Sequence, residues 1–141
     1  MQNISEMLDL PFNHTVTIII ITVIISMVAF SNQNVMNRLI FWPPAMQRGQ
    51  YDRFITHGFI HADGMHLLFN MFTLFFFGSI IESFYRQYFY ELGFVLFYLG
   101  GLIFAILPSY LKHKNDVRWA SLGASGAVSA VLFAYVLFEP W

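Results

Sequence analysis

The sequence predicts an all-α, multi-span helical membrane protein. Of its 141 residues, 57% are hydrophobic and 11% are charged, and the mean hydropathy is +0.60. Soluble domains carry about 25% charged residues, so an ordinary soluble domain is excluded. The charges also fall between long apolar stretches, because a charged side chain at the bilayer centre costs roughly 2.5 to 3.5 kcal/mol. The length allows one membrane domain over residues 1–141 and no second domain.

Four stretches avoid charge and are predicted to be transmembrane helices. They cover residues 15–30, 64–81, 92–111 and 119–138. About 20 helical residues cross roughly 30 Å of hydrocarbon, which is close to the length of the last three stretches. The lipid bilayer is therefore the first partner of this chain.

The connector between the first two stretches is long and contains Trp42 followed by Pro43 and Pro44. Adjacent prolines are expected to forbid a regular helix there, and tryptophan favours the membrane interface. We therefore expect this connector to lie on or partly in the bilayer surface.

Composition also limits the chemistry. The absence of cysteine excludes disulfides, Cys-ligated zinc and thiol catalysis. The net charge of −1 gives no reason to expect nucleic acid as a partner, and no cofactor is expected. Catalysis would have to come from serine, histidine, asparagine or carboxylates.

Three polar residues are predicted to lie at similar depth in two spans. The second and fourth spans are separated by one crossing, so they begin at the same membrane face. Asn70 follows Asp63 by as many residues as Ser125 follows Arg118, which places both roughly 10 Å below these charges at 1.5 Å per residue. His66 lies one turn before Asn70 on the same helical face. A lone polar residue often only joins helices, but a hydroxyl with two donors is what acyl transfer requires.

Two runs of the sequence resemble motifs of the rhomboid intramembrane serine proteases. The run "RFITHGFIHADGMHLLFNMFTLFFFGSIIE", residues 53–82, resembles their first-loop and second-helix signature, and "GASGA", residues 123–127, resembles their Gly-x-Ser-Gly nucleophile motif. The short motif alone is weak, but both occur in the family's order and separation. Arg53 and Glu82 match positions with structural roles. The resemblance implies a rhomboid-like bundle from the first span onward.

The resemblance implies a role for each polar residue of the predicted site. Ser125 would be the nucleophile, and its backbone N–H would form the oxyanion hole with the side chains of His66 and Asn70. His61 would line the site from above. No metal is implied. The substrates would be single-span membrane proteins, and the protein would be an integral, multi-pass protein of the bacterial cytoplasmic membrane.

The resemblance also indicates what is missing. Rhomboid proteases have at least six transmembrane helices and a general-base histidine on the sixth, whereas no histidine follows Ser125 here. A serine without a base is a weak nucleophile. The chain is therefore expected to be a bundle truncated after the fourth helix and inactive alone. If an in-chain histidine replaced the base, His61 is the expected one.

Two other functions stay open. A non-catalytic rhomboid-like protein could bind transmembrane clients, although binding does not need all three polar residues of the site. Alternatively, His57, His61 and His66 could supply three imidazoles to zinc. His57 and His61 would lie on the same face only in a regular helix, and Gly58 argues against one there.

The distribution of basic residues conflicts with the family's topology. Six of the seven Lys and Arg residues lie in the first and third connectors: Arg38, Arg48, Arg53, Lys112, Lys114 and Arg118. The positive-inside rule would place the predicted site in the cytoplasm. The bacterial rhomboid pattern implies the opposite orientation.

A seam of small residues runs along the fourth span. Gly126, Ala130 and Ala134 recur at four-residue spacing, which lets another helix approach closely. Without further helices, this seam is expected to be uncovered. We therefore expect the chain to self-associate or to pack loosely.

Overall fold

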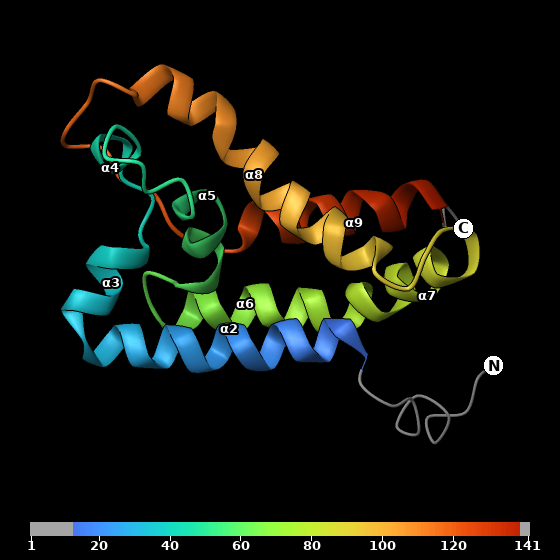
Figure 1. Ribbon diagram of the computed structural model, residues 1–141. Helices are drawn as coiled ribbons and strands as arrows, with labels where there is room; N and C mark the ends of the chain where they lie inside the picture. The colour runs from blue at the N-terminus through green and yellow to red at the C-terminus, as the bar shows by residue number, and fades with distance from the viewer. Residues whose placement is uncertain (1–12, 139–141) are drawn as a thin grey trace.

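Helices make up most of the computed structural model, which describes residues 13–138 (Figure 1). In chain order they are α2 (His14–Ser31), α3 (Gln33–Leu39), α4 (Pro43–Met46), α5 (Arg53–Thr56), the 3-10 turn η1 (His57–Phe59), α6 (Gly64–Thr73), the π-helical turn η2 (Leu74–Gly78), α7 (Ser79–Tyr88), α8 (Gly93–His113) and α9 (Ser125–Phe138). Within residues 13–138, three helices are long and apolar enough to cross a membrane: α2, the continuous Gly64–Tyr88 helix and α8. The predicted all-α membrane fold is confirmed.

The fourth apolar helix is shorter than predicted. α9 has 14 residues and begins at Ser125, not at residue 119. Residues 119–124 are not helical, because Phe41 and Ser121 exchange both of their backbone hydrogen bonds at 2.9 Å. The depth of Ser125 is therefore set by this segment and its pairing, so the argument from helical rise is wrong for this residue.

The first connector is more ordered than the proline pair suggested. Pro43 and Pro44 start the four-residue helix α4, where a missing N–H costs nothing. The expectation that they forbid a helix is therefore wrong for this single turn. Arg53 is buried and donates from Nη1 to the carbonyl oxygens of Asn37 at 2.9 Å and Ile40 at 2.7 Å. These bonds hold the connector against α5.

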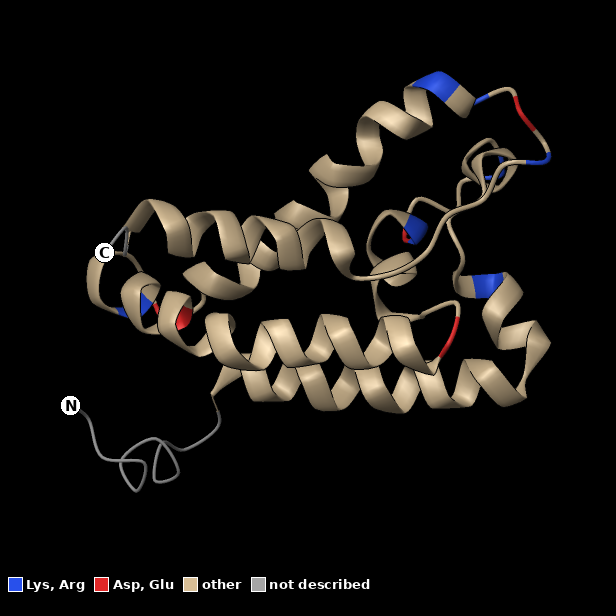
Figure 2. Ribbon diagram, turned by 180° about the vertical axis from the view of Figure 1, so that it is seen from behind, with Lys and Arg blue, Asp and Glu red and all other residues tan. Residues whose placement is uncertain are grey.

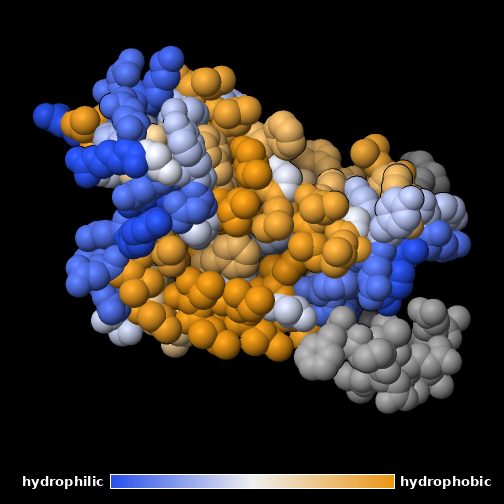
Figure 3. Space-filling model, in the orientation of Figure 1, coloured by the Kyte–Doolittle hydropathy of each residue, from blue (hydrophilic) through white to orange (hydrophobic). Residues whose placement is uncertain are grey.

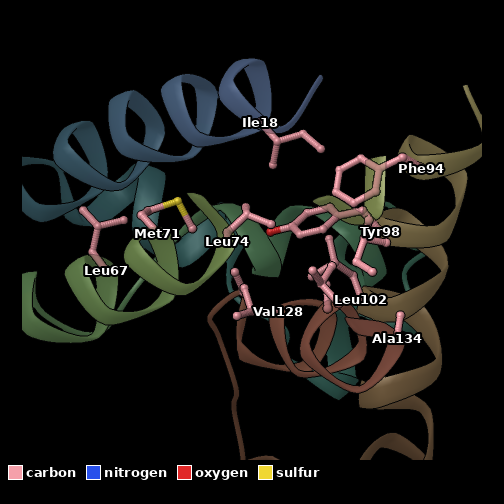
Figure 4. Packing of buried hydrophobic residues seen from close by; sticks show 13 residues of the cluster. Ile18, Leu67, Met71, Leu74, Phe94, Tyr98, Leu102, Val128 and Ala134 are labelled. Atoms are coloured by element: carbon pink, nitrogen blue, oxygen red, sulfur yellow. The ribbon is translucent and has the colours of Figure 1, made fainter. Parts of the chain in front are cut away.

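The core lies where the long helices meet. Buried side chains converge there from α2, α6, η2, α8 and α9, as Figure 4 shows for Ile18, Leu67, Met71, Leu74, Phe94, Tyr98, Leu102, Val128 and Ala134. This packing makes α6 and α9 neighbours. Both helices begin at the same end of the bundle (Figure 1), as predicted for the second and fourth spans.

The seam of small residues on α9 faces α8. A Cβ atom at Gly126 would overlap the Cβ atom of Ala105, and one at Gly101 would lie 3.5 Å from that of Ala130. Ala134 is also buried. The prediction of an uncovered seam is wrong, because α8 packs along it. The seam therefore gives no reason for self-association.

We expect Gly126→Ala to destabilise the protein by about 1 to 3 kcal/mol, because the added methyl must push α8 and α9 apart. Gly100→Ala is the matched control, since a Cβ atom at Gly100 would have no neighbour within 4 Å. That control should be neutral or stabilising, because alanine is the better helix former. Thermal unfolding in detergent would compare the two. Equal stability of both variants would show that the α8–α9 contact is loose.

Candidate active site

Ser125 is the first residue of α9, and its backbone is positioned from two sides. The preceding Gly123 has φ +112°, a conformation that favours glycine. Its N–H donates to the carbonyl oxygen of His57 at 2.8 Å. The Ser125 side chain is exposed. At the first turn of a helix the backbone N–H groups lack intrahelical partners and favour negative charge, which suits a developing oxyanion.

His61 is buried and holds the loop in front of Ser125. The Ala124 N–H donates to His61 Nε2 at 3.3 Å, so Nε2 is unprotonated and Nδ1 carries the hydrogen. Nδ1 lies 3.1 Å from Ser26 Oγ, and that hydroxyl donates to the carbonyl oxygen of Phe59 at 2.9 Å. The pKa of His61 is lowered to about 4, and burial is the largest cause. The neutral ring therefore ties α2 to the residue before Ser125.

His66 and Asn70 are both placed on α6, next to α9. Asp63 caps α6, since its Oδ1 accepts the His66 N–H at 2.9 Å and its Oδ2 lies 2.9 Å from His66 Nδ1. The His66 side chain is 70% exposed, and Asn70 is half-buried one turn further along. Within residues 13–138, no hydrogen bond joins either side chain to Ser125.

A pocket of about 180 Å³ opens beside Ser125, between α8 and the segment that precedes α9. Its polar lining comes from His57, Ser109, Ser121 and Ser125. His57 is buried and donates from Nδ1 to the carbonyl oxygen of Arg53 at 2.9 Å, and burial is the main cause that lowers its pKa.

His57 was considered from the sequence only as a possible zinc ligand, and its place in this pocket was not predicted. As Gly58 indicated, no regular helix joins His57 to His61, because α5 ends at Thr56 and only the three-residue 3-10 turn η1 follows.

The structure argues against His61 as a replacement base. Both of its ring nitrogens already have partners, Ala124 N–H and Ser26 Oγ. The zinc alternative finds no support either, because no group of three or more His, Cys, Asp or Glu residues in the described part of the chain could hold a metal ion.

Comparison with known families identifies the fold around this site. The Rhomboid domain model matches residues 48–141, which include every residue of the predicted site. The chain belongs to the rhomboid family. It is thus an integral membrane protein of the rhomboid type, as its apolar helices also indicate.

Rhomboid relatives occur in both bacteria and plants. RHOMBOID-like protein 12, mitochondrial, of Arabidopsis thaliana is 30% identical over 123 residues, which are 79% of this chain and 36% of the relative. Rhomboid protease GlpG of Enterobacter sp. (strain 638) is 32% identical over 126 residues, covering 86% and 41%. GlpG of Klebsiella pneumoniae (strain 342) is 29% identical over 124 residues, with the same coverage. The chain spans about two-fifths of the length of these relatives.

The stability of the rhomboid bundle should fall as the pH is lowered from about 6.5 to about 4. His61 stays neutral in the folded state down to pH about 4, whereas its ordinary pKa is 6.5. The unfolded chain therefore binds the proton first, and the stability that the neutral ring contributes is present above pH 6.5. This stability is lost progressively as the pH falls from about 6.5, and the loss is complete below about 4. The difference between the two pKa values of His61 corresponds to about 3 kcal/mol of unfolding free energy.

Thermal unfolding in detergent between pH 7.5 and pH 4 would measure this loss, with His61→Asn as the control. Asparagine can accept the Ala124 N–H but does not titrate, so this variant should have a shallower pH dependence. Identical pH dependence in the two proteins would contradict the assignment of the buried neutral imidazole.

Proposed function

We propose that this chain forms the part of a rhomboid intramembrane serine protease that carries the nucleophile and the oxyanion hole. The single observation that supports this most is the position of Ser125. It heads α9 with an exposed side chain at the edge of a pocket, next to the helix that carries His66 and Asn70.

The chemistry follows from these positions. Ser125 Oγ attacks the substrate carbonyl carbon while its proton passes to the general base, and the carbonyl oxygen becomes an oxyanion. The Ser125 N–H, His66 and Asn70 stabilise that oxyanion. The peptide C–N bond then breaks, the amine leaves with a proton from the general base, and water hydrolyses the acyl-enzyme.

The general base is assigned to a part of the protein outside this sequence. His61 is engaged at both nitrogens, and His66 is assigned to the oxyanion hole. The relatives are more than twice as long as the segment that they share with this chain, which leaves room for further helices. The 141 residues alone are therefore expected to be inactive.

The substrates are single-span membrane proteins that can unwind near the cleavage site. A peptide bond inside a helix has its carbonyl oxygen already hydrogen-bonded and is shielded from attack, so cleavage requires an extended segment. The GlpG relatives support the bacterial cytoplasmic membrane as the location.

The test uses the full-length protein that contains this chain, reconstituted in liposomes with a single-span reporter substrate. Ser125→Ala should abolish both cleavage and labelling by a fluorophosphonate. Ser129→Ala is the matched control, because Ser129 is also exposed, one turn further along α9, and this variant should cleave at close to the unmodified rate. The isolated 141 residues should label negligibly.

Two results would contradict the proposal. Cleavage that survives Ser125→Ala would exclude the nucleophile assignment. If the unmodified protein bound the reporter stably and never cleaved it, the non-catalytic, client-binding function would be favoured instead.

A further inference from the structure

The positive charges of this protein gather at one end of the bundle. Six of the seven Lys and Arg residues lie at the end where α6 and α9 begin, and only Arg86 lies at the other end, as Figure 2 shows. Three carboxylates share the crowded end: Asp52, Asp63 and Asp116. The end that carries the site therefore has a clear excess of positive charge.

Two of the six cations are committed to structure. Arg53 is buried and binds backbone carbonyl oxygens, and Arg38 pairs with Asp52 at 3.0 Å. The other four are exposed and form no ion pair within residues 13–138: Arg48, Lys112, Lys114 and Arg118. Their charge is available to a partner.

The fold brings these four cations together around two indole rings. Trp42 Nε1 donates to the carbonyl oxygen of Val117 at 2.9 Å, which ties α4 to the α8–α9 connector beside Arg118. The Arg48 guanidinium lies 5.8 Å from the Trp42 ring centroid. We call Arg48, Lys112, Lys114 and Arg118, with Trp42 and Trp119, the Trp42 rim.

The α8–α9 connector holds the second indole of the Trp42 rim. The Trp119 ring stacks on His113, the last residue of α8, with centroids 4.6 Å apart. Asp116 is the carboxylate within this connector, and its Oδ1 accepts the Arg118 N–H at 2.9 Å. The Trp42 rim thus carries four exposed cations, whereas its connector contributes one carboxylate.

The position of the rim identifies its partner. α8 is one of the helices that can span the membrane, and Lys112 and Lys114 stand at its end. Tryptophan side chains favour the level of the lipid headgroups. In Figure 3 the hydrophilic residues at this end directly border the hydrophobic surface of the bundle. Cations at that level face lipid phosphates, whereas a soluble acidic polypeptide would leave the adjoining apolar surface unmatched.

We infer that the Trp42 rim binds the headgroups of anionic phospholipids. A Lys or Arg near an anionic membrane surface strengthens binding by about fivefold. Four such cations would enrich anionic lipid around α4 and the end of α8. This inference does not depend on the proposed protease activity.

The test measures lipid binding by tryptophan quenching in the 141-residue chain. In a Trp141→Phe background, Trp42 and Trp119 are the remaining tryptophans. The protein is reconstituted in phosphatidylcholine vesicles that contain either brominated phosphatidylglycerol or brominated phosphatidylcholine. We expect phosphatidylglycerol to quench with at least about fivefold higher apparent affinity, and the preference to fall at high salt.

Two variants separate charge from fold. Lys112→Gln/Lys114→Gln/Arg118→Gln should reduce the preference to near none, whereas the charge-conserving Lys112→Arg/Lys114→Arg/Arg118→Lys should keep it. Asp116→Asn, which retains an oxygen to cap the turn, should raise the preference. Because Asp116→Asn raises the net positive charge of the Trp42 rim, it tests the inference even if the triple glutamine variant fails to fold.

Three results would overturn the inference. Equal quenching by the two brominated lipids in the unmodified chain would show that the rim has no preference for anionic headgroups. Loss of the preference on adding millimolar inorganic phosphate would show a site for free phosphate. Its loss on adding soluble polyglutamate at constant ionic strength would show a site for acidic polypeptide.

Discussion

Replacing Asn70 by alanine in the full-length protein is expected to lower kcat by about 10² to 10³, which is the usual effect of removing one oxyanion-hole donor. The donor acts on charge that develops in the transition state, so KM should change little. Steady-state cleavage of a single-span reporter in liposomes would measure both constants.

Thr73→Val is the matched control for this experiment. Thr73 is half-buried on α6, one turn beyond Asn70, and is not assigned to the oxyanion hole. Its replacement should leave kcat within a few fold of the unmodified value. If both variants lost activity to the same extent, Asn70 would be acting through the packing of α6, and the oxyanion role would be refuted.

Glu82→Ala is expected to cause the largest loss of stability, about 2 to 4 kcal/mol. The Glu82 carboxylate is 3% exposed and accepts the backbone N–H groups of His14 at 2.8 Å and Thr15 at 2.9 Å. It also accepts the Thr15 hydroxyl at 2.7 Å and the Arg86 guanidinium at 3.2 Å. Each donor left without a partner costs about 1 to 3 kcal/mol, although Arg86 can recover some hydration because it is partly exposed.

Thermal unfolding in detergent would measure this loss against two controls. Glu82→Gln keeps an acceptor oxygen and should lose less stability than the alanine variant. Glu91→Ala removes an exposed carboxylate from the same end of the bundle and should stay within about 0.5 kcal/mol of the unmodified protein. A Glu82→Ala protein as stable as the Glu91→Ala protein would show that the contact with the start of α2 is dispensable.

The membrane spans could be predicted because their signal is local and additive. Each charged residue carries its own cost in hydrocarbon, so charge-free stretches located α2, residues 64–81 of the Gly64–Tyr88 helix and α8 without knowledge of any contact. The ion pair between Glu82 and Arg86 also depends on local sequence alone, because residues four apart share one helical face. Their Oε1 and Nη2 atoms lie 3.2 Å apart. The motif around Ser125 could be recognised because its residues are consecutive in the chain.

Contacts between distant segments could not be read from the chain in this way. Residues 119–124 are free of charge like the helix that follows, and their non-helical conformation depends on pairing with Phe41 in another connector. The seam of small residues indicated a close helix contact but not that α8 makes it. Likewise, the full set of donors to Glu82 includes the start of α2, far away in sequence.

Around Ser125, too, some features follow from local sequence and others from contacts between distant segments. Local sequence was enough to propose the nucleophile and the helix that carries His66 and Asn70. The bond from Ala124 N–H to His61 and the place of His57 in the pocket beside Ser125 arise only when the first connector, α8 and α9 meet. Hydropathy and helical period report how each segment meets the bilayer, whereas these polar contacts depend on which segments the packed core brings side by side.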